Sequence, residues 1–291
     1  MQLAAAAVSH FDLTVASGRF PVKPPLPYVP GIDGAGRVLR SERFPSGTPV
    51  RIRGAGVGTT RPGTWSELAA VPDEALSAVP EGVDLTLAAT FFSPCVTAHV
   101  AVHELGALTT GEAVAVTGAS GAVGSIAVQL ALRGGAGRVV GVIRRPESAA
   151  ALPPGVEAVL AADGVDPVKR EDGVDLLVDT VGGQGLAELA LGALRPEGRV
   201  VLVGYTGGTE VTFELPSLLA TGVRLIALTM IRWAPKMGGV ADELLAALDR
   251  RELSLPRTAF PLDRLPEAIA GLRGGGIPGR LAVVPVSADR L

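Results

Sequence analysis

The chain has 291 residues and a formal net charge of −3, and it is 47% hydrophobic and 19% charged. This composition excludes a disordered chain, and the length predicts two domains or one large one. The chain has no excess of basic residues, so the sequence does not indicate a nucleic-acid partner. It has no run of about 20 apolar residues, so the sequence does not predict a membrane span. The single cysteine, Cys95, excludes an intrachain disulfide, so a reducing, cytoplasmic compartment is expected.

The first part of the chain, residues 1–94, is predicted to be rich in β-structure. Short apolar runs separated by proline and glycine are typical of antiparallel strands in a barrel-like unit. These strands are expected at residues 3–8, 36–39, 49–52 and 66–71. A helix is expected over residues 85–105, with a break near Pro94.

From Glu112 onwards, apolar strands alternate with helices. Strands are expected at residues 113–117, 138–143, 158–160, 175–179, 198–203 and 223–228, and helices at 125–133 and 184–193. Strands that are apolar throughout indicate a parallel sheet covered on both faces. The predicted fold class is therefore α/β, with a doubly wound parallel sheet.

The last part, residues 234–291, is mixed again. Helices are expected at residues 240–250 and 265–272, and strands at 258–262 and 280–284. The chain thus divides into an α/β insert, residues 95–233, between two other pieces, 1–94 and 234–291. We expect these two pieces to pack together.

A glycine loop joins the strand at residues 113–117 to the following helix. Its spacing, Ala119-x-Gly121-x-x-Gly124, is the dinucleotide-binding pattern with alanine at the first position. Small residues let the backbone approach a pyrophosphate, whose oxygens meet the N–H groups at the helix start. A tight turn that needs glycine for steric reasons alone is the alternative, but the strand before and the helix after favour a nucleotide.

The end of the next strand bears on the choice of nucleotide. A carboxylate there would bind the ribose 2′-hydroxyl of NAD, whereas this strand ends in Arg144 and Arg145. Two guanidinium groups suit a 2′-phosphate, which favours NADPH. The alternative is that both arginines are solvated loop residues.

Eight segments carry further motifs in a definite order. They are residues 5–18 (AAAVSHFDLTVASG), 26–36 (LPYVPGIDGAG), 63–67 (GTWSE), 97–99 (TAH), 116–131 (VTGASGAVGSIAVQLA), 175–183 (DLLVDTVGG), 198–204 (GRVVLVG) and 279–283 (GRLAV). Together they resemble the medium-chain dehydrogenase/reductase superfamily, in its zinc-independent quinone oxidoreductase (zeta-crystallin-like) and enoyl reductase branch.

The resemblance implies a Rossmann-type NADPH-binding domain, residues 95–233, inserted in a GroES-like barrel-type substrate domain formed by residues 1–94 and 234–291. Members of the family have further strands before the segment that corresponds to residues 5–18 of this chain. The barrel of this chain is therefore expected to lack strands at one edge, or to have that edge covered by another segment. The cofactor residues that it implies are Thr97, Ser120, Gly121, Ala122, Val123, Gly124, Arg144, Arg145, Val181, Gly204 and Tyr205.

The chain departs from the family in ways that bear on chemistry. Zinc-dependent relatives have a histidine and a glutamate after the Pro-Gly pair, where this chain has Ile32 and Asp33. No metal is therefore expected. Ser9 stands where quinone oxidoreductases often have asparagine, and His99 replaces a tyrosine. His99 and His103 could together bind a metal, but the sequence offers no third ligand beside them, so no metal site is expected there.

The implied reaction is hydride transfer from NADPH to a quinone or an α,β-unsaturated carbonyl, a small hydrophobic electrophile. The candidate proton donors are Ser9, His10 and Tyr28, although a backbone-capping serine, an exposed turn histidine and a loop-capping tyrosine are the plainer interpretations. Asp12 is expected to fix local loop structure, and Cys95 to be an inert buried thiol.

Two alternatives stay open: a tailoring ketone or enoyl reductase on the same scaffold, and a non-catalytic protein that senses NADPH. By the same resemblance, the protein is expected to form a homodimer through the edge strand at residues 223–228.

Overall fold

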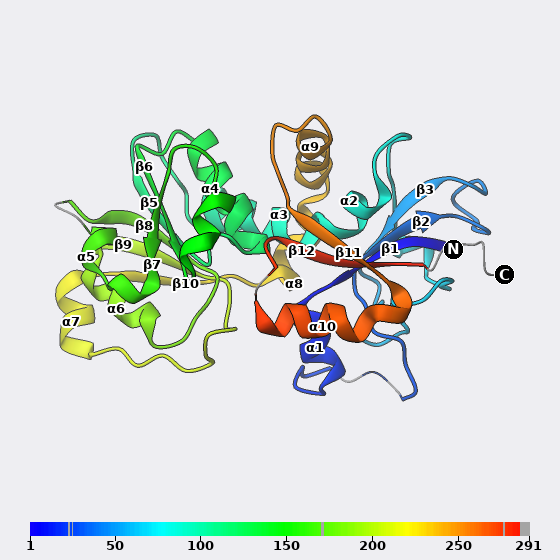
Figure 1. Ribbon diagram of the computed structural model, residues 1–291, viewed down its shortest axis with the longest axis horizontal. Coiled ribbons are helices and arrows are strands. Elements are labelled where there is room, and N and C mark those ends of the chain that lie inside the picture. The colour runs from blue at the N-terminus through cyan, green and yellow to red at the C-terminus, as the bar shows by residue number, and fades with distance from the viewer. Residues whose placement is uncertain (23, 25, 170–171, 276, 286–291) are drawn as a thin grey trace. The chain divides into compact units, whose positions relative to one another are not determined.

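The computed structural model describes residues 1–22, 24, 26–169, 172–275 and 277–285 (Figure 1). The chain divides into two compact units. Unit 1 contains Met1–Ser93 together with the described residues from Leu255 onwards, and unit 2 is Pro94–Ser254. Each unit has a six-stranded sheet of its own.

The sheet of unit 1 is mainly antiparallel and runs in the order β11-β12-β1-β2-β3-β4. Its strands are β1 (Gln2–Val8), β2 (Gly34–Arg37), β3 (Pro49–Ile52), β4 (Leu76–Ala78), β11 (Arg257–Pro261) and β12 (Arg280–Val284). The first strand of the chain lies between β12 and β2, so both of its edges are paired. Of the alternatives left open for the edge of this sheet, covering by another segment holds at β1, because the strand β12 pairs with it.

One predicted strand of unit 1 is wrong. Residues 66–71 make only an isolated bridge, between Leu68 and Gln2, and the fourth strand comes later, at β4. The helices of this unit are α1 (His10–Ala16), α2 (Leu85–Thr90) and α10 (Leu265–Gly274). Figure 1 shows α10 lying along the strands β11, β12 and β1, which it contacts.

The predicted break near Pro94 is displaced. The chain leaves α2 at Phe91, and Pro94 is the third residue of the next helix, α3 (Phe92–His99). A proline is tolerated there because a first-turn N–H has no partner within the helix. A π-helical turn, Val100–Glu104, continues α3.

The sheet of unit 2 is parallel and runs in the order β10-β9-β8-β5-β6-β7. Its strands are β5 (Ala113–Thr117), β6 (Arg138–Ile143), β7 (Val156–Leu160), β8 (Val174–Asp179), β9 (Leu194–Leu202) and β10 (Arg224–Ala227). The chain runs outwards from β5 to β7 and then returns to β8 on the other side of β5. This reversal confirms the doubly wound Rossmann-type sheet, with its switch point between β5 and β8.

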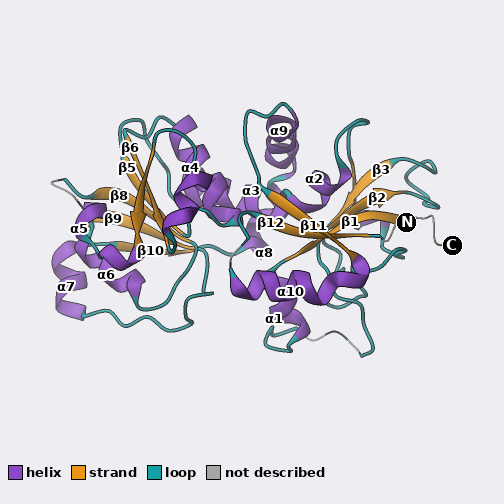
Figure 2. Ribbon diagram, in the orientation of Figure 1, coloured by secondary structure: helices purple, strands orange, loops and turns teal. Residues whose placement is uncertain are grey.

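Helices lie on both sides of this sheet (Figure 2). Among them, α4 (Ala122–Arg133) contacts β5 and β6, and both α6 (Gly185–Gly192) and α7 (Leu215–Thr221) contact β9. The other helices between residues 122 and 249 are α5 (Asp166–Lys169), α8 (Met230–Trp233) and α9 (Gly238–Asp249). Short 3₁₀ turns occur at Asp73–Ala75, Pro146–Ala151, Ala161–Asp163, Ala234–Lys236 and Leu262–Arg264. Strand β10 pairs with β9 alone among the described strands, and the homodimer expected through this edge stays a prediction.

The second boundary between the units lies after Ser254, whereas the sequence placed it after Trp233. Side chains of α4 explain the difference. The Gln129 amide donates to the carbonyl of Ser254 and accepts from its N–H, both at 2.8 Å, and Arg133 contacts Glu252. These contacts attach the end of α9 to unit 2, and no periodic pattern in the sequence reports them.

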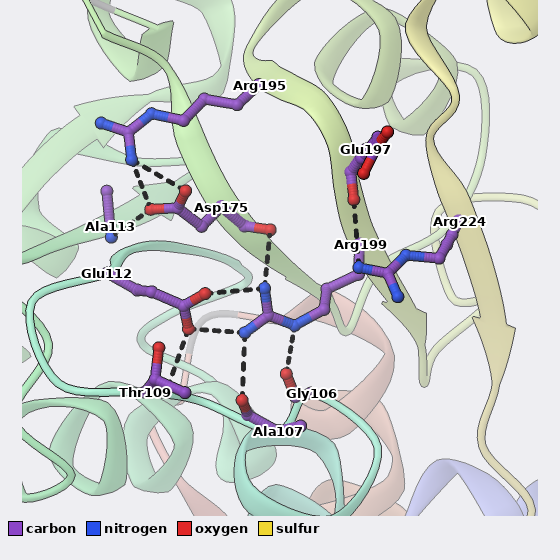
Figure 3. Close-up of polar contacts among 10 residues, drawn as sticks. All are labelled: Gly106, Ala107, Thr109, Glu112, Ala113, Asp175, Arg195, Glu197, Arg199 and Arg224. Carbon is purple, nitrogen blue, oxygen red and sulfur yellow. Dashed lines mark hydrogen bonds and ion pairs between the residues drawn. The ribbon is translucent and has the colours of Figure 1, made fainter.

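A buried arginine on β9 contacts β8 and the segment before β5 at the amino-terminal edge of this sheet (Figure 3). Arg199 on β9 makes a two-pronged ion pair with Glu112, at 2.9 and 2.5 Å, and also donates to the carbonyls of Gly106, Ala107 and Asp175. Burial raises the pKa of Glu112, but the bonds from Arg199 and the Thr109 N–H outweigh it and hold this pKa below its ordinary value.

We expect Arg199→Met to lower the free energy of unfolding by about 3 kcal/mol at neutral pH, since it leaves the Glu112 carboxylate without its partner. A depressed pKa contributes stability above the unfolded-state value and loses it as the pH falls through the folded-state value. The difference between wild type and variant, measured by urea unfolding, should therefore shrink on acidification. Arg264→Met, in an exposed pair with Glu267, is the control and should change little. A difference independent of pH would contradict the ion pair.

Candidate functional site

The glycine loop begins where β5 ends. Gly121 is the residue before α4, and no side chain caps the first N–H groups of this helix. A Cβ on Gly124 would lie 2.2 Å from the carbonyl oxygen of Gly118, so only glycine allows the helix to start this close to the strand. The loop therefore presents open backbone donors at the carboxyl edge of the sheet.

A buried carboxylate holds the neighbouring loop in place. Asp179, at the end of β8, is 1% exposed and accepts a hydrogen bond from the Thr117 hydroxyl at 2.6 Å. It also accepts from the N–H groups of Val181, at 3.4 Å, and Gly182, at 2.9 Å. Burial raises the pKa of Asp179 more than these bonds lower it. The carboxylate thus ties β5 to the loop after β8.

The loop after β9 lies directly against the loop after β8. The N–H groups of Val203 and Gly204 donate to the carbonyl of Asp179, at 2.9 and 3.1 Å, and Gly207 donates to that of Val181 at 2.8 Å. A Cβ on Gly204 would lie 1.8 Å from the Thr180 carbonyl oxygen. Backbone therefore packs on backbone at this edge, with Val181, Gly204 and the half-exposed Tyr205 in adjacent loops.

The predicted residues of unit 2 fall into three places. Ser120 to Gly124, Val181, Gly204 and Tyr205 lie in the loops just described, at the switch point of the sheet. Arg144 is exposed and Arg145 half-buried, and both follow β6, the strand beside β5. Thr97 is buried on α3, and its expected approach to the cofactor stays a prediction. The sequence did not single out Thr117 or Asp179 as site residues. The visible signal was that each is a polar residue at the end of an apolar strand, β5 for Thr117 and β8 for Asp179.

In unit 1, Ser9 and Asp12 form a reciprocal pair at the start of α1. The Ser9 N–H and hydroxyl both donate to Asp12 Oδ2, at 2.8 and 2.5 Å, and the Asp12 N–H donates to Ser9 Oγ at 3.2 Å. The Ile32 N–H donates to the other carboxylate oxygen at 2.9 Å. Asp12 is 1% exposed, and its burial raises the pKa to about 6, despite the bonds from Ser9 and Ile32 and the charge of Arg280.

Tyr28 and His10 differ in their surroundings. The Tyr28 hydroxyl is buried and has no hydrogen-bond partner among the described residues. Its burial and the negative charge of Asp12 raise the pKa of this phenol. His10 is the first residue of α1 and is exposed, but partial burial and the charge of Arg280 lower the pKa of its ring. Ser9 and Asp12 thus form a buried hydrogen-bonded pair, and the charge of Asp12 acts on the half-buried Tyr28.

Comparison with known proteins gives a family. The model of the zinc-binding dehydrogenase family matches residues 122–246. Acrylyl-CoA reductase AcuI of Ruegeria pomeroyi is 34% identical, over 88% of this chain and 81% of that protein. The putative quinone oxidoreductase YhfP of Bacillus subtilis is 30% identical, over the same shares of the two chains. The chain belongs to the medium-chain dehydrogenase/reductase superfamily.

Solved structures of this superfamily agree with that assignment. A quinone oxidoreductase of Pseudomonas syringae pv. Tomato superposes with a TM-score of 0.84 at 25% identity, covering 98% of this chain and 90% of that one. The structure of Escherichia coli YhdH with bound NADPH superposes with a TM-score of 0.79 at 27% identity, covering 97% and 90%. This member of the superfamily is an oxidoreductase of the quinone oxidoreductase and enoyl reductase branch, and the loops of unit 2 fit a nicotinamide cofactor.

The name of the matched family mentions zinc, and the residues of this chain do not fit a zinc site. Asp33 lies after the Pro-Gly pair, where zinc-dependent members have ligands, but Arg53 contacts its Oδ1 at 2.5 Å and Arg280 its Oδ2 at 3.5 Å. Two guanidinium groups oppose a metal cation there. Across the described ranges, no three His, Cys, Asp or Glu side chains gather in a way that could hold a metal.

None of the described helices combines the length and the apolar character that crossing a membrane requires.

Two glycines of the loop should separate folding from nucleotide binding. Gly124→Ala forces a methyl group onto the Gly118 carbonyl, so we expect a loss of about 2 kcal/mol in the free energy of unfolding. Gly121→Ala brings its methyl only to 3.1 Å from that oxygen and should keep most of the stability. Its methyl group would lie where a pyrophosphate meets the backbone, and the affinity for NADPH should fall about tenfold or more.

The measurements are thermal unfolding and the fluorescence of bound NADPH. Unchanged NADPH affinity in a folded Gly121→Ala variant would show that the nucleotide does not bind at this loop.

Proposed function

We propose that this protein reduces a quinone or an α,β-unsaturated carbonyl compound with NADPH. The observation that carries the proposal is the backbone cradle at the carboxyl ends of β5, β8 and β9, beside the strand β6, which is followed by two arginines and not by a carboxylate. Two relatives support the substrate class, because one is named for acrylyl-CoA and the other for quinones. Both compounds have an electron-poor carbon conjugated to an oxygen.

The preference for NADPH rests on Arg144 and Arg145. They follow β6 at the same edge as the glycine loop, where a dinucleotide with its pyrophosphate on α4 would place its adenosine ribose. The guanidinium group of an arginine donates two charge-assisted hydrogen bonds to phosphate oxygens, whereas a carboxylate would repel the negatively charged phosphate. The NADPH bound in the related E. coli structure agrees with this choice.

The protein's part in the reaction is to orient the dinucleotide and the substrate and to exclude water. Bound NADPH supplies a hydride to the electron-poor carbon of the substrate. The glycine loop and the loops tied by Asp179 fix the position of the dinucleotide. Ser9 and Tyr28 supply the hydroxyl groups of the substrate unit, and a hydrogen bond from one of them would stabilise the negative charge that develops on the substrate oxygen.

A panel of electrophiles tests the reaction. Purified protein should oxidise NADPH in the presence of simple quinones, 2-cyclohexenone or acrylyl-CoA, as followed by the loss of absorbance of the reduced nicotinamide. Product analysis should show a saturated carbon–carbon bond for the enone and the thioester. NADPH that binds without turnover across the whole panel would support a non-catalytic sensor, and reduction of isolated ketones alone would support a ketone reductase.

The double variant Arg144→Ala, Arg145→Ala tests the cofactor preference. The dissociation constant for NADPH should rise by about one to two orders of magnitude, the usual worth of lost bonds to a charged phosphate, while that for NADH changes little. Arg133→Ala is the control, because this arginine is on the same unit but contacts Glu252 at the far end of α4. Equal losses for both nucleotides would show that the pair does not recognise the 2′-phosphate.

A further inference from the structure

The pair formed by Ser9 and Asp12 does more than begin a helix. A capping box needs two bonds: the serine oxygen accepts the N–H of the third helical residue, and the acidic side chain accepts the N–H of the serine. Both are present at α1. A third bond, from the Ser9 hydroxyl to Asp12 Oδ2 at 2.5 Å, is not needed for capping. It uses the single proton that the hydroxyl carries.

The third bond decides what Ser9 can offer to a neighbour. An ionised carboxylate only accepts hydrogen bonds, so the Ser9 proton then points at Asp12 and the hydroxyl cannot donate elsewhere. If Oδ2 carries a proton, that proton is donated to Ser9 Oγ, and the serine proton is free to turn away from Asp12. Oδ2 still accepts from the Ser9 N–H, so the helix start keeps its bonds in both states.

We propose that Asp12 is a positioning residue that supplies protons through Ser9, so that Ser9 donates to the reduced substrate only while the Asp12 carboxyl is protonated. This inference rests on the proposed function. It adds to the expected role of Asp12 in local structure, which its bonds from the N–H groups of Ser9 and Ile32 support.

The proton step balances as follows. Hydride from NADPH forms a C–H bond at the β-carbon of the enone. The electron pair of the C=C bond moves to form a double bond between the α-carbon and the carbonyl carbon, and the π pair of the carbonyl group moves to its oxygen. The Ser9 O–H bond breaks as its proton passes to that oxygen, and Ser9 Oγ takes the proton of Asp12 Oδ2. Asp12 is left as a carboxylate, which takes a proton from water before the next turnover. The enol becomes the ketone in solution.

The groups around Asp12 favour this use. Burial disfavours the carboxylate, and so does the nearby charge of Asp33, whereas Arg280 on β12, the Ser9 hydroxyl and the Ile32 N–H favour it. The balance puts the pKa at about 6, close to the neutral range in which a proton donor is most effective. His10, on the same helix, and Tyr28 are the other titratable groups near Asp12. Partial burial and the charge of Arg280 lower the pKa of His10, and burial and the charge of Asp12 raise the pKa of Tyr28.

The central test is the pH dependence of kcat for enone reduction between about pH 5 and about pH 8. Wild type should lose about tenfold per pH unit above the Asp12 pKa, until protonation by water sets a floor. Asp12→Asn keeps an oxygen for the helix start but has no carboxyl proton, so its kcat should be low and independent of pH. Ser9→Ala and the double variant should match it, because the two residues act as one unit.

A structural role alone would not produce these results. Thr14→Ala removes the other hydroxyl bonded within α1, at 3.0 Å to the His10 carbonyl, and should keep the wild-type pH profile. The KM for NADPH should change less than about twofold in all variants. A descending limb that survives in Asp12→Asn, or a flat profile in an active wild type, would overturn the relay and leave the proposed function standing. A wild type without turnover at every pH would overturn both.

A second measurement needs neither cofactor nor activity. Carbon-13 NMR of aspartate carboxyl groups should show one resonance that titrates near pH 6 and that is missing in Asp12→Asn. Ser9→Ala should raise this pKa, because the Ser9 hydroxyl stabilises the carboxylate. A downward shift or none would show that the hydroxyl does not bind the carboxylate and would overturn the inference.

Discussion

The arrangement of unit 2 depends on how closely three loops approach one another at the carboxyl edge of its sheet. The loops after β5, β8 and β9 meet backbone to backbone, and side chains are excluded at Gly124 and Gly204 because no room exists for a Cβ. Asp179 supports this approach, since its buried carboxylate accepts hydrogen bonds from Thr117 at the end of β5 and from Gly182 in the loop after β8. A surface built from backbone N–H groups is what a pyrophosphate binds, so steric exclusion and function coincide here.

The same sheet is secured at its opposite edge by charge. Arg199 links β9 to the segment before β5 and to the backbone of β8, and Arg195 pairs with Asp175 beside it (Figure 3). Parallel strands cannot be joined by tight hairpins, so their relative positions depend on such cross-strand contacts as well as on the ladder. Side chains at the amino-terminal edge of the sheet thus hold the strands together, and the backbone at the carboxyl edge is available to bind a ligand.

Unit 1 uses its buried charges differently. Asp33 is held between Arg53 and Arg280, and its backbone carbonyl accepts from Ala7 and Thr64. This pairing places a cation beside Asp12, where the charge of Arg280 limits how far burial raises the carboxyl pKa. The position that carries metal ligands in zinc-dependent relatives is therefore part of an ion-pair network that tunes a proton-binding group.

The sequence alone determined the parallel sheet, the chain order of its six strands, the helices α4 and α6 and the glycine loop, because these depend on local periodicity and on the spacing of small residues. It also indicated the family, through motifs that recur in order. It placed a strand at residues 66–71 and ended unit 2 too early, because strand pairing and the bonds from Gln129 to Ser254 join residues far apart in the chain. Only the tertiary structure decided that β12 covers β1, that Asp179 ties the loops together, and that Asp12 lies buried against Ser9. Burial and long-range hydrogen bonds set those outcomes, and neither is written in any local pattern of residues.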